Sequence, residues 1–287
     1  MENLLVILSE VVLSAYPLLI KLVDTSVFFQ VGLRMIVFTV CAALAAIVTG
    51  APVFPSGAGA ETAAVGILNL LHVAGSYIGF EKLAGGNAMA LFYTYPVFNI
   101  LGASAVLGEK FPLRSLPWIG VAVAGTIALA QPSAARGWSA IGVAAALLAA
   151  LTETGIYLWF KSHKDGSSDQ PYTKMVQMYG SSAVAWLLGA AALLLVGAGG
   201  GAFNISSGGL GAVLGFNTLV GFLGYALRFY LIPRVSTVVF SALSFFGIIS
   251  AYLLSWLFAG EVPTALQAAG AAAIIAANAV LVTPETA

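Results

Sequence analysis

The stretch NLLVILSEVVLSAYPLLIKL, residues 3–22, decides the class of fold to expect. It is almost entirely apolar and has the length that an α-helix needs to cross the hydrocarbon core of a bilayer. Two ionisable residues interrupt it, Glu10 near its middle and Lys21 near its end. No basic cluster precedes it and no small-residue cleavage site follows it. We therefore interpret it as the first membrane span rather than as a signal peptide.

The whole chain has the composition of an integral membrane protein. Of its 287 residues, 60% are hydrophobic and 8% are charged, whereas a soluble domain carries about 25% charged residues. The formal net charge is zero, which argues against a nucleic-acid partner because such a partner requires a basic surface. Cys41 is the single cysteine, so an internal disulfide is impossible. Lipid is the expected environment of most of the surface.

Ten apolar segments can be placed along the chain, separated by short stretches rich in glycine, proline and charged residues. They do not alternate with the period of two that a membrane strand requires, so helices are expected. The sequence thus predicts an all-α membrane protein with ten transmembrane helices. The expected spans are residues 3–22, 27–49, 60–83, 87–108, 114–131, 137–161, 172–197, 207–231, 236–259 and 264–283.

Lysine and arginine residues are unevenly distributed between the two sides of this arrangement. With ten spans, both termini lie on one side, and that side also receives the larger number of basic loop residues. The positive-inside rule therefore predicts that both termini are cytoplasmic. The side with the termini has Lys110, Arg114, Lys161, Lys164, Lys174 and Arg234, and the opposite side has Lys21, Lys82 and Arg136.

Two short similarities relate the first and second halves of the chain. Glu10 in the first span corresponds to Glu153 in the sixth, and Glu109 after the fourth span corresponds to Glu261 after the ninth. Five spans per half is an odd number, so the halves would insert in opposite orientations. We therefore expect two inverted five-helix repeats in one membrane domain. Their predicted ranges are residues 1–135 and 136–287.

Polar side chains recur at helical spacing inside eight of the spans. Such groups are costly in hydrocarbon and usually face the interior of a bundle. The spans 114–131 and 264–283 are instead rich in alanine and glycine, so we expect them at the periphery as packing helices. The other eight should surround a polar cavity. Its candidate substrate-binding residues are Glu10, Ser14, Arg34, His72, Ser76, Tyr77, Tyr95, Asn99, Glu153, Tyr157, Arg228 and Ser244.

Each of these residues also has a structural interpretation. Serine and asparagine in a span often only bond a neighbouring helix, and His72 could be a neutral buried histidine with one bond. Arg34 and Arg228 could be structural partners of the carboxylates Glu10, Glu81 or Glu153, or of carbonyls at helix ends. The two glutamates at equivalent places in the halves are the strongest candidates for transport, because each lies well inside its span.

Several short motifs resemble those of a known family. They are Tyr95-Pro96 with Glu109 following, Trp256 to Glu261 at the end of the ninth span, and Arg34 in the second span. With these motifs the chain resembles the ten-helix EamA-type exporters of the drug/metabolite transporter superfamily. It departs from the pattern in lacking a proline in the ninth span that matches Pro96. The resemblance implies a bacterial-type inner-membrane carrier of small metabolites, often an exporter of amino acids, with a central cavity.

The residues leave two transport functions open. A zwitterionic amino acid needs both signs of charge in its site. Glu10 or Glu153 could meet its ammonium group, and its carboxylate could meet Arg34, His72 or Arg228. Export would then follow alternating access between the two halves. Alternatively, paired membrane carboxylates with nearby aromatic rings suit a proton-coupled exporter of lipophilic or quaternary cations.

An enzymatic function is not expected. The chain has neither the H-E-x-x-H zinc motif nor the G-x-S-x-G nucleophile motif, and it has no glycine-rich phosphate loop. We therefore expect no cofactor and no metal. The expected partners are a small-molecule substrate, the lipid bilayer and, for the cation alternative, protons. A monomer suffices, because ten spans already bury both halves.

Overall fold

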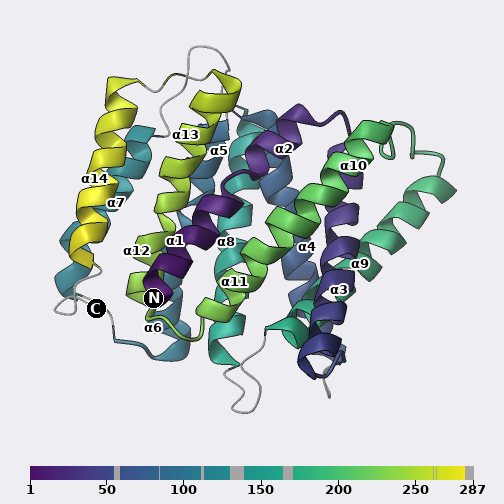
Figure 1. Ribbon diagram of the computed structural model, residues 1–287, viewed down its shortest axis with the longest axis horizontal. Helices are drawn as coiled ribbons and strands as arrows, with labels where there is room; N and C mark the ends of the chain where they lie inside the picture. The colour runs from purple at the N-terminus through teal and green to yellow at the C-terminus, as the bar shows by residue number, and fades with distance from the viewer. Residues whose placement is uncertain are drawn as a thin grey trace.

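The computed structural model is a bundle of α-helices, which confirms the predicted all-α membrane fold (Figure 1). It describes residues 1–54, 59–83, 85–110, 113–129, 139–163, 171–260, 262 and 264–281. Within these ranges there is no β-strand, and an isolated bridge joins Thr25 to Ile205. The helices are α1 (Glu2–Leu13), α2 (Tyr16–Leu22), α3 (Val27–Thr49), α4 (Gly59–Lys82), α5 (Gly85–Phe92), α6 (Tyr95–Leu107), the 3₁₀ turn η1 (Leu113–Ser115), α7 (Leu116–Leu129), α8 (Ala140–Ser162), α9 (Tyr172–Leu195), α10 (Ser207–Phe216), the π-helical turn η2 (Asn217–Phe222), α11 (Leu223–Leu231), α12 (Thr237–Ser244), α13 (Phe246–Ala259) and α14 (Ala265–Leu281).

Within the described residues, eight helical segments are long and apolar enough to cross a bilayer. They are α1 with α2, α3, α4, α5 with α6, α8, α9, α10 with α11, and α12 with α13. The expected fifth and tenth spans are shorter apolar helices, at Leu113–Ala128 and Ala265–Leu281. The count of ten spans stays a prediction, because a helix needs about 20 residues to cross the hydrocarbon core.

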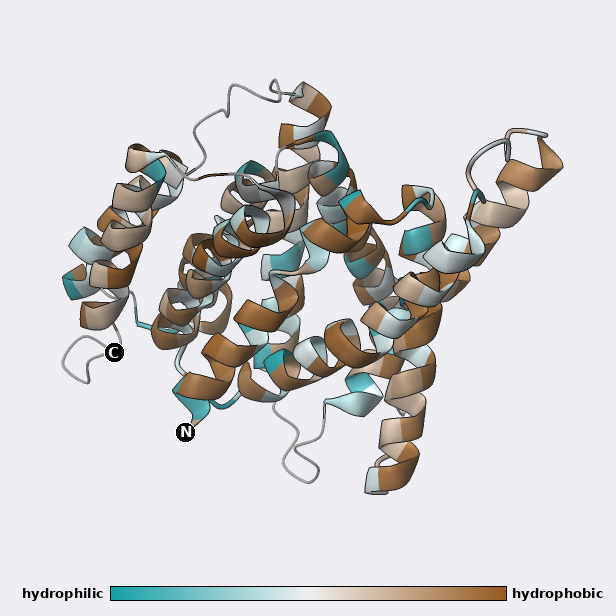
Figure 2. Cartoon of the chain, turned by 45° about the horizontal axis from the view of Figure 1, so that its top comes forward, coloured by the Kyte–Doolittle hydropathy of each residue, from teal (hydrophilic) through white to brown (hydrophobic). Residues whose placement is uncertain are grey.

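Apolar side chains cover the outer faces of the bundle. Val48, Leu188 and Phe258 are examples of large apolar residues that are well exposed. Figure 2 shows hydrophobic residues along most of the length of the helices, with hydrophilic residues in small groups between them. A surface of this kind is stable in lipid rather than in water, so the chain is a multi-pass membrane protein.

Three of the spans are broken near their middle, between α1 and α2, between α5 and α6, and between α12 and α13. Pro17 and Pro96 explain the first two breaks, because a proline cannot donate to the carbonyl four residues earlier. The third break, at Phe245, occurs without a proline. Here Ser244 Oγ donates to Phe240 O at 2.9 Å, a type of bond that often bends helices.

The segment from α10 to α11 is continuous but contains the π-helical turn η2. Asn217 begins this turn, and its Oδ1 accepts a 3.0 Å hydrogen bond from Tyr16 Oη of α2. A Cβ atom at Gly221 would lie 2.1 Å from the same hydroxyl. The absence of a side chain at Gly221 therefore allows the Tyr16 hydroxyl to lie directly against η2.

The helices α7 and α14 pack against each other at one edge of the bundle (Figure 1). This is the peripheral position expected for the two segments rich in small residues. Toward the interior, α8 packs on α4, α5 and α6, and α1 packs on α11, α12 and α13. At Gly75 of α4, a Cβ atom would lie 2.8 Å from the Ala145 carbonyl of α8, so these two backbones approach closely. The helices that carry Glu10 and Glu153 are therefore both interior.

Some sequence-based predictions fall on parts of the chain outside the described residues. The boundary between the predicted halves at 135 and 136 lies there, together with Arg136, Lys164 and Glu261. Lys161, counted above among the loop cations, belongs to α8 and is buried. Its Nζ donates to the carbonyls of Ile232 and Val235, at 3.2 and 2.5 Å. This lysine therefore caps the end of α11 instead of contributing to a loop.

Candidate functional site

Arg228 of α11 lies between two buried carboxylates. Its Nη1 donates to Glu10 Oε1, and its Nε and Nη2 donate to Glu153 Oε1 at 3.0 and 2.7 Å. The structural interpretation of Arg228 as a partner of these two glutamates therefore describes its contacts, whereas Glu81 pairs with Lys82 at 2.9 Å. One guanidinium joins a carboxylate of the first expected half to a carboxylate of the second.

Three hydroxyl groups complete the surroundings of Glu10. Tyr93 and Tyr95 donate to its Oε2, at 2.8 and 3.3 Å. The Ser244 hydroxyl, which donates to Phe240 O, lies 3.3 Å from its Oε1. The Tyr95 hydroxyl also accepts from Arg228 Nη1 at 3.1 Å. Tyr93 lies just after α5, Tyr95 begins α6 and Ser244 ends α12, so two of the helix breaks bring hydroxyl groups to one carboxylate.

His72 of α4 faces the second carboxylate. Its Nδ1 lies 3.2 Å from Ala149 O, which can only accept, so Nδ1 carries a proton. Its Nε2 lies 3.4 Å from Glu153 Oε2, and neither atom has a hydrogen-bond partner within the described residues. Two facing acceptors of this kind have room for one further proton, shared between the imidazole and the carboxylate.

Arg34 of α3 has different surroundings from Arg228. Its guanidinium carbon lies 4.5 to 5.7 Å from the centroids of four aromatic rings, those of Tyr225, Tyr16, Phe38 and Tyr77. It is 1% exposed, and its Nε and Nη2 make no hydrogen bond in the part of the chain that the structure describes. Arg34 is thus held by ring faces and not by a carboxylate.

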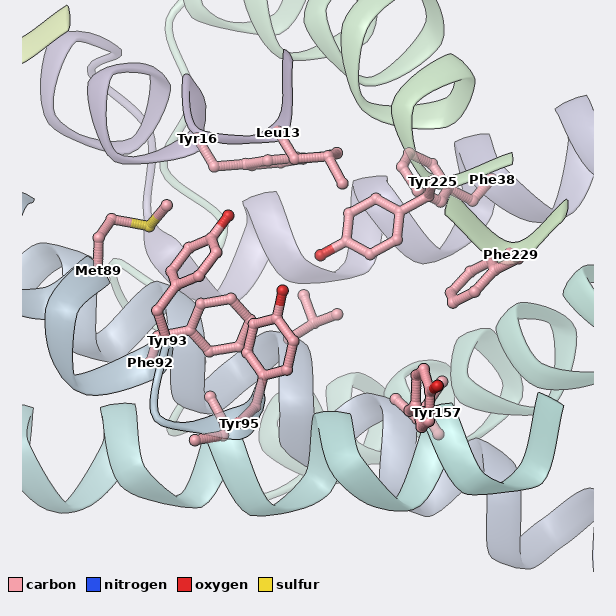
Figure 3. Close-up of a cluster of buried hydrophobic side chains, with 14 of the residues drawn as sticks. Leu13, Tyr16, Phe38, Met89, Phe92, Tyr93, Tyr95, Tyr157, Tyr225 and Phe229 are labelled. Carbon is pink, nitrogen blue, oxygen red and sulfur yellow. The ribbon is translucent and has the colours of Figure 1, made fainter. Parts of the chain in front are cut away.

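A cavity of about 20 Å³ joins these two arginine environments. It has room for about one water molecule. Its charged lining residues are Glu10, Arg34, Glu153 and Arg228, and Ser76, Tyr16, Tyr93 and Tyr225 are among its other lining residues. Figure 3 shows Tyr93, Tyr95 and Tyr225 with their hydroxyls directed into one interior space, and Tyr157 lying apart from them.

The cavity does not include every residue proposed from the sequence. Ser14 Oγ donates to Val11 O of its own helix at 2.6 Å. Tyr157, which lies one helical turn after Glu153 in α8, donates to Thr237 at 3.1 Å. Asn99 is fully buried, and both of its amide atoms are without a partner among the described residues. Tyr77 contributes its ring to the surroundings of Arg34, while Ser76 lines the cavity.

The list of candidate residues from the sequence lacks three tyrosines that line the cavity, Tyr16, Tyr93 and Tyr225. Tyr225 precedes Arg228 by three residues on the same helical face, so the helical spacing could have identified it. Tyr93 precedes Tyr95 by two residues, which in a continuous helix places the side chains on different faces. The break at Thr94 brings both hydroxyls to Glu10.

The two proline breaks also change the backbone beside the cavity. Pro17 leaves the carbonyl of Leu13 without its helical donor, and Pro96 does the same for Phe92. Leu13 and Phe92 both line the cavity. Discontinuous helices with free carbonyls are a recurrent feature of substrate sites in transporters.

A larger cavity of about 750 Å³ lies between α3, α4 and α9. Its lining consists mainly of apolar side chains such as Ile67, Val184 and Leu188, and no charged residue of the described chain contributes to it. An apolar space of this kind offers little to a polar solute. The smaller charged cavity is therefore the candidate site. In the described part of the chain, no group of three or more His, Cys, Asp or Glu residues is arranged to hold a metal ion.

Comparison with known proteins agrees with this combination of lipid-exposed helices and buried charges. Residues 1–131 match the model of the EamA-like transporter family. This part of the chain is similar to the EamA-like transporters. The EamA-like part contains Glu10, Arg34, His72 and Tyr95, and the resemblance inferred from the sequence is confirmed over it. Members of such a family are transporters rather than enzymes, so the chain is a membrane transporter of small solutes.

A similarity in fold alone covers more of the chain than residues 1–131. One crystal structure of a protein matches 98% of this chain and 95% of its own, with a TM-score of 0.71 and 16% sequence identity. At this identity the match shows a shared fold alone. No curated protein sequence matches the chain.

Proposed function

We propose that the protein is a secondary transporter that exports amino acids through its central cavity by alternating access. A single observation carries this proposal: one small, buried cavity is lined by Glu10, Glu153, Arg228 and Arg34. Buried charges are costly within a membrane and are usually retained for a substrate or ion pathway. Charges of both signs suit a zwitterion, whose ammonium group would approach the glutamates.

The packing of the helices supports the inverted-repeat part of the proposal. If each helix of the first half corresponds to one of the second, the contact of α4 with α8 corresponds to the contact of α11 with α1, and both are present. The broken segments α5–α6 and α12–α13 also correspond. Alternating access would move one half against the other around the charged cavity.

The membrane and its orientation are part of the same proposal. The predominance of basic loop residues on the side of the termini supports a bacterial-type inner membrane with both termini cytoplasmic. Reporter fusions test this orientation. A reporter that folds only in the cytoplasm should be active at both ends of the chain, and activity at one end alone would contradict it.

The transport proposal is tested with purified protein in liposomes. Vesicles are loaded with an isotope-labelled mixture of amino acids, and release is followed with and without a proton gradient. We expect saturable release that is lost in Glu10→Gln and retained in the matched variant Glu81→Gln, whose side chain is 46% exposed. Absence of saturable movement of any amino acid would exclude the proposed substrate class.

A second candidate function is favoured by the geometry of His72 and Glu153. His72 Nε2 and Glu153 Oε2 lie 3.4 Å apart and can share one proton. A shared proton suits a carrier that exchanges a proton for a lipophilic or quaternary cation. Glu10→Gln and Glu153→Gln discriminate between the two functions. Loss of cation movement while amino-acid release is intact would favour the cation exporter.

A further inference from the structure

We propose that Arg34 binds the carboxylate group of the transported solute, together with the hydroxyls of Tyr77 and Tyr179. This inference rests on the proposed function and assigns one of its open roles. The sequence left three cations as alternatives for this role, namely Arg34, His72 and Arg228. The contacts of the three side chains separate them.

Arg228 is already committed to carboxylates. Three of its N–H directions point to Glu10 and Glu153, and its Nη1 also reaches Tyr95. A solute carboxylate that approached Arg228 would have to compete with two fixed anions. His72 faces Glu153 with its free nitrogen, so a second carboxylate there would meet a like charge. Four of the five N–H groups of Arg228 are thus used and the free nitrogen of His72 faces a carboxylate, so neither residue suits an incoming anion.

Arg34 has the opposite arrangement. Its Nε and Nη2 are buried donors with no acceptor among the described residues, and no carboxylate of those residues forms an ion pair with it. Ring faces stabilise its charge from several sides. However, the N–H groups of a guanidinium lie in its own plane, and an aromatic face does not accept hydrogen bonds from them as a carboxylate would. A buried guanidinium with unused donors is therefore ready for a bidentate anion.

Two tyrosine hydroxyls extend this set of donors. Tyr77 and Tyr179 are fully buried, and within the described chain neither hydroxyl has a hydrogen-bond partner. The Tyr77 ring lies 5.7 Å from the guanidinium carbon of Arg34. The Tyr179 ring lies 4.8 Å from Phe38, which itself flanks Arg34 at 5.2 Å. A carboxylate has enough acceptor sites for several such donors.

The charges of the cavity favour a solute with both signs. Glu10 and Glu153 contribute two formal negative charges, and Arg34 and Arg228 contribute two positive charges, so the lining is formally neutral. A zwitterion preserves this balance, whereas an amine or an acid alone adds one uncompensated charge. The anionic end of the zwitterion would bind at Arg34, because Tyr16 and Tyr225 beside it also line the cavity.

The test compares three probes of the same shape: leucine, leucinamide, which lacks the carboxylate, and 4-methylpentanoate, which lacks the amine. Binding is measured as ligand-induced thermal stabilisation of the purified protein, and release is measured from liposomes. In Arg34→Gln we expect leucine binding to weaken by about tenfold or more, as for the loss of a charged hydrogen-bonding partner. The ratio of leucine to leucinamide affinity should therefore fall toward one.

Further variants keep the test independent of folding. Arg34→Lys retains the charge and should recover part of the preference for leucine. Tyr179→Phe and Tyr77→Phe remove hydroxyls that have no partner in the described structure, so they should leave the fold intact while weakening leucine more than leucinamide. Glu81→Gln should change neither affinity.

The outcomes separate this inference from the proposed function. Equal loss of leucine and leucinamide binding in Arg34→Gln, Tyr77→Phe and Tyr179→Phe, with normal thermal unfolding, would overturn the role of Arg34. The role of Arg34 would also be overturned if 4-methylpentanoate stabilised Arg34→Gln to the same extent as the wild-type protein. If the wild-type protein binds leucine through Arg34 but moves no amino acid across liposomes, the transport proposal fails while the binding site stands.

Discussion

The hydroxyl of Tyr93 occupies the space that a side chain at Gly247 would need. A Cβ atom at position 247 would lie 1.8 Å from Tyr93 Oη, which donates to Glu10 at 2.8 Å. The absence of a side chain at Gly247 in α13 therefore leaves room for this hydrogen bond of Tyr93, which lies just after α5. This contact connects the second half of the chain to the carboxylate of the first.

Gly247→Ala is expected to displace the Tyr93 hydroxyl from Glu10. The overpacking should cost about 1–3 kcal/mol in the free energy of unfolding, because the interior is tightly packed. Amino-acid release should fall to the level of Tyr93→Phe. Thermal unfolding in detergent and liposome flux measure the two effects. The matched control is Gly189→Ala, since a Cβ atom there has nothing within 4 Å. Equal behaviour of the two alanine variants would contradict the packing argument.

Arg228→Met is expected to be strongly destabilising. It leaves the carboxylates of Glu10 and Glu153 buried without their common cation, and breaking a buried pair costs about 3–5 kcal/mol. The triple variant Glu10→Gln, Glu153→Gln, Arg228→Met removes the whole charge group and should be more stable than Arg228→Met alone. Chemical unfolding of both variants checks the order. If the triple variant is the less stable one, the three side chains do not act as a unit.

Asn99→Leu is expected to stabilise the fold. Asn99 is completely buried, and neither of its amide atoms has a hydrogen-bond partner in the described chain. Burial therefore removes its hydrogen bonds to water, and no protein hydrogen bond replaces them. Replacement by an apolar side chain of similar size should raise stability by about 1 kcal/mol. Ser241→Ala, which removes another buried hydroxyl with no partner in the described residues, is the companion variant. A decrease in the melting temperature of Asn99→Leu would show that the amide has a bound partner.

Pro17→Ala and Pro96→Ala are expected to stiffen the two broken spans. Each restores an N–H that can donate to the carbonyl of Leu13 or Phe92, and these residues line the cavity. Hydrogen exchange should show protection of the new amides, and liposome flux should slow several-fold, as is common for substitutions at hinges. Pro171→Ala, before α9 and away from the cavity, is the control. Unchanged flux with protected amides would mean that the breaks have no role in transport.

Helical spacing was sufficient to find the charged residues of the candidate site. Glu10, Glu153 and Arg228 meet because each lies on the inner face of a continuous stretch of helix. The same rule fails at Tyr93. The helix breaks at Thr94, so Tyr93 and Tyr95 face the same side although they are two residues apart. Spacing along a sequence describes a face only where the helix is regular.

Other features of the site depend on contacts that one helix cannot reveal. Asn99 and Tyr157 lie on the expected faces, yet they are a turn away from the charges of the cavity. The break at Phe245 has no proline to announce it. The pairing of Arg228 with both glutamates, and the lack of such a pair at Arg34, depend on how α3 and α11 are rotated in the bundle. Rotation follows from the packing of all helices together.

The charged cavity has room for about one water molecule, and its formal charges sum to zero. It can therefore stay closed without a bound solute. The protein without substrate can then change back from its outward-facing to its inward-facing state. We therefore expect net efflux down a gradient and not obligatory one-for-one exchange. Efflux into buffer that contains no amino acid should therefore run nearly as fast as efflux into buffer that contains it.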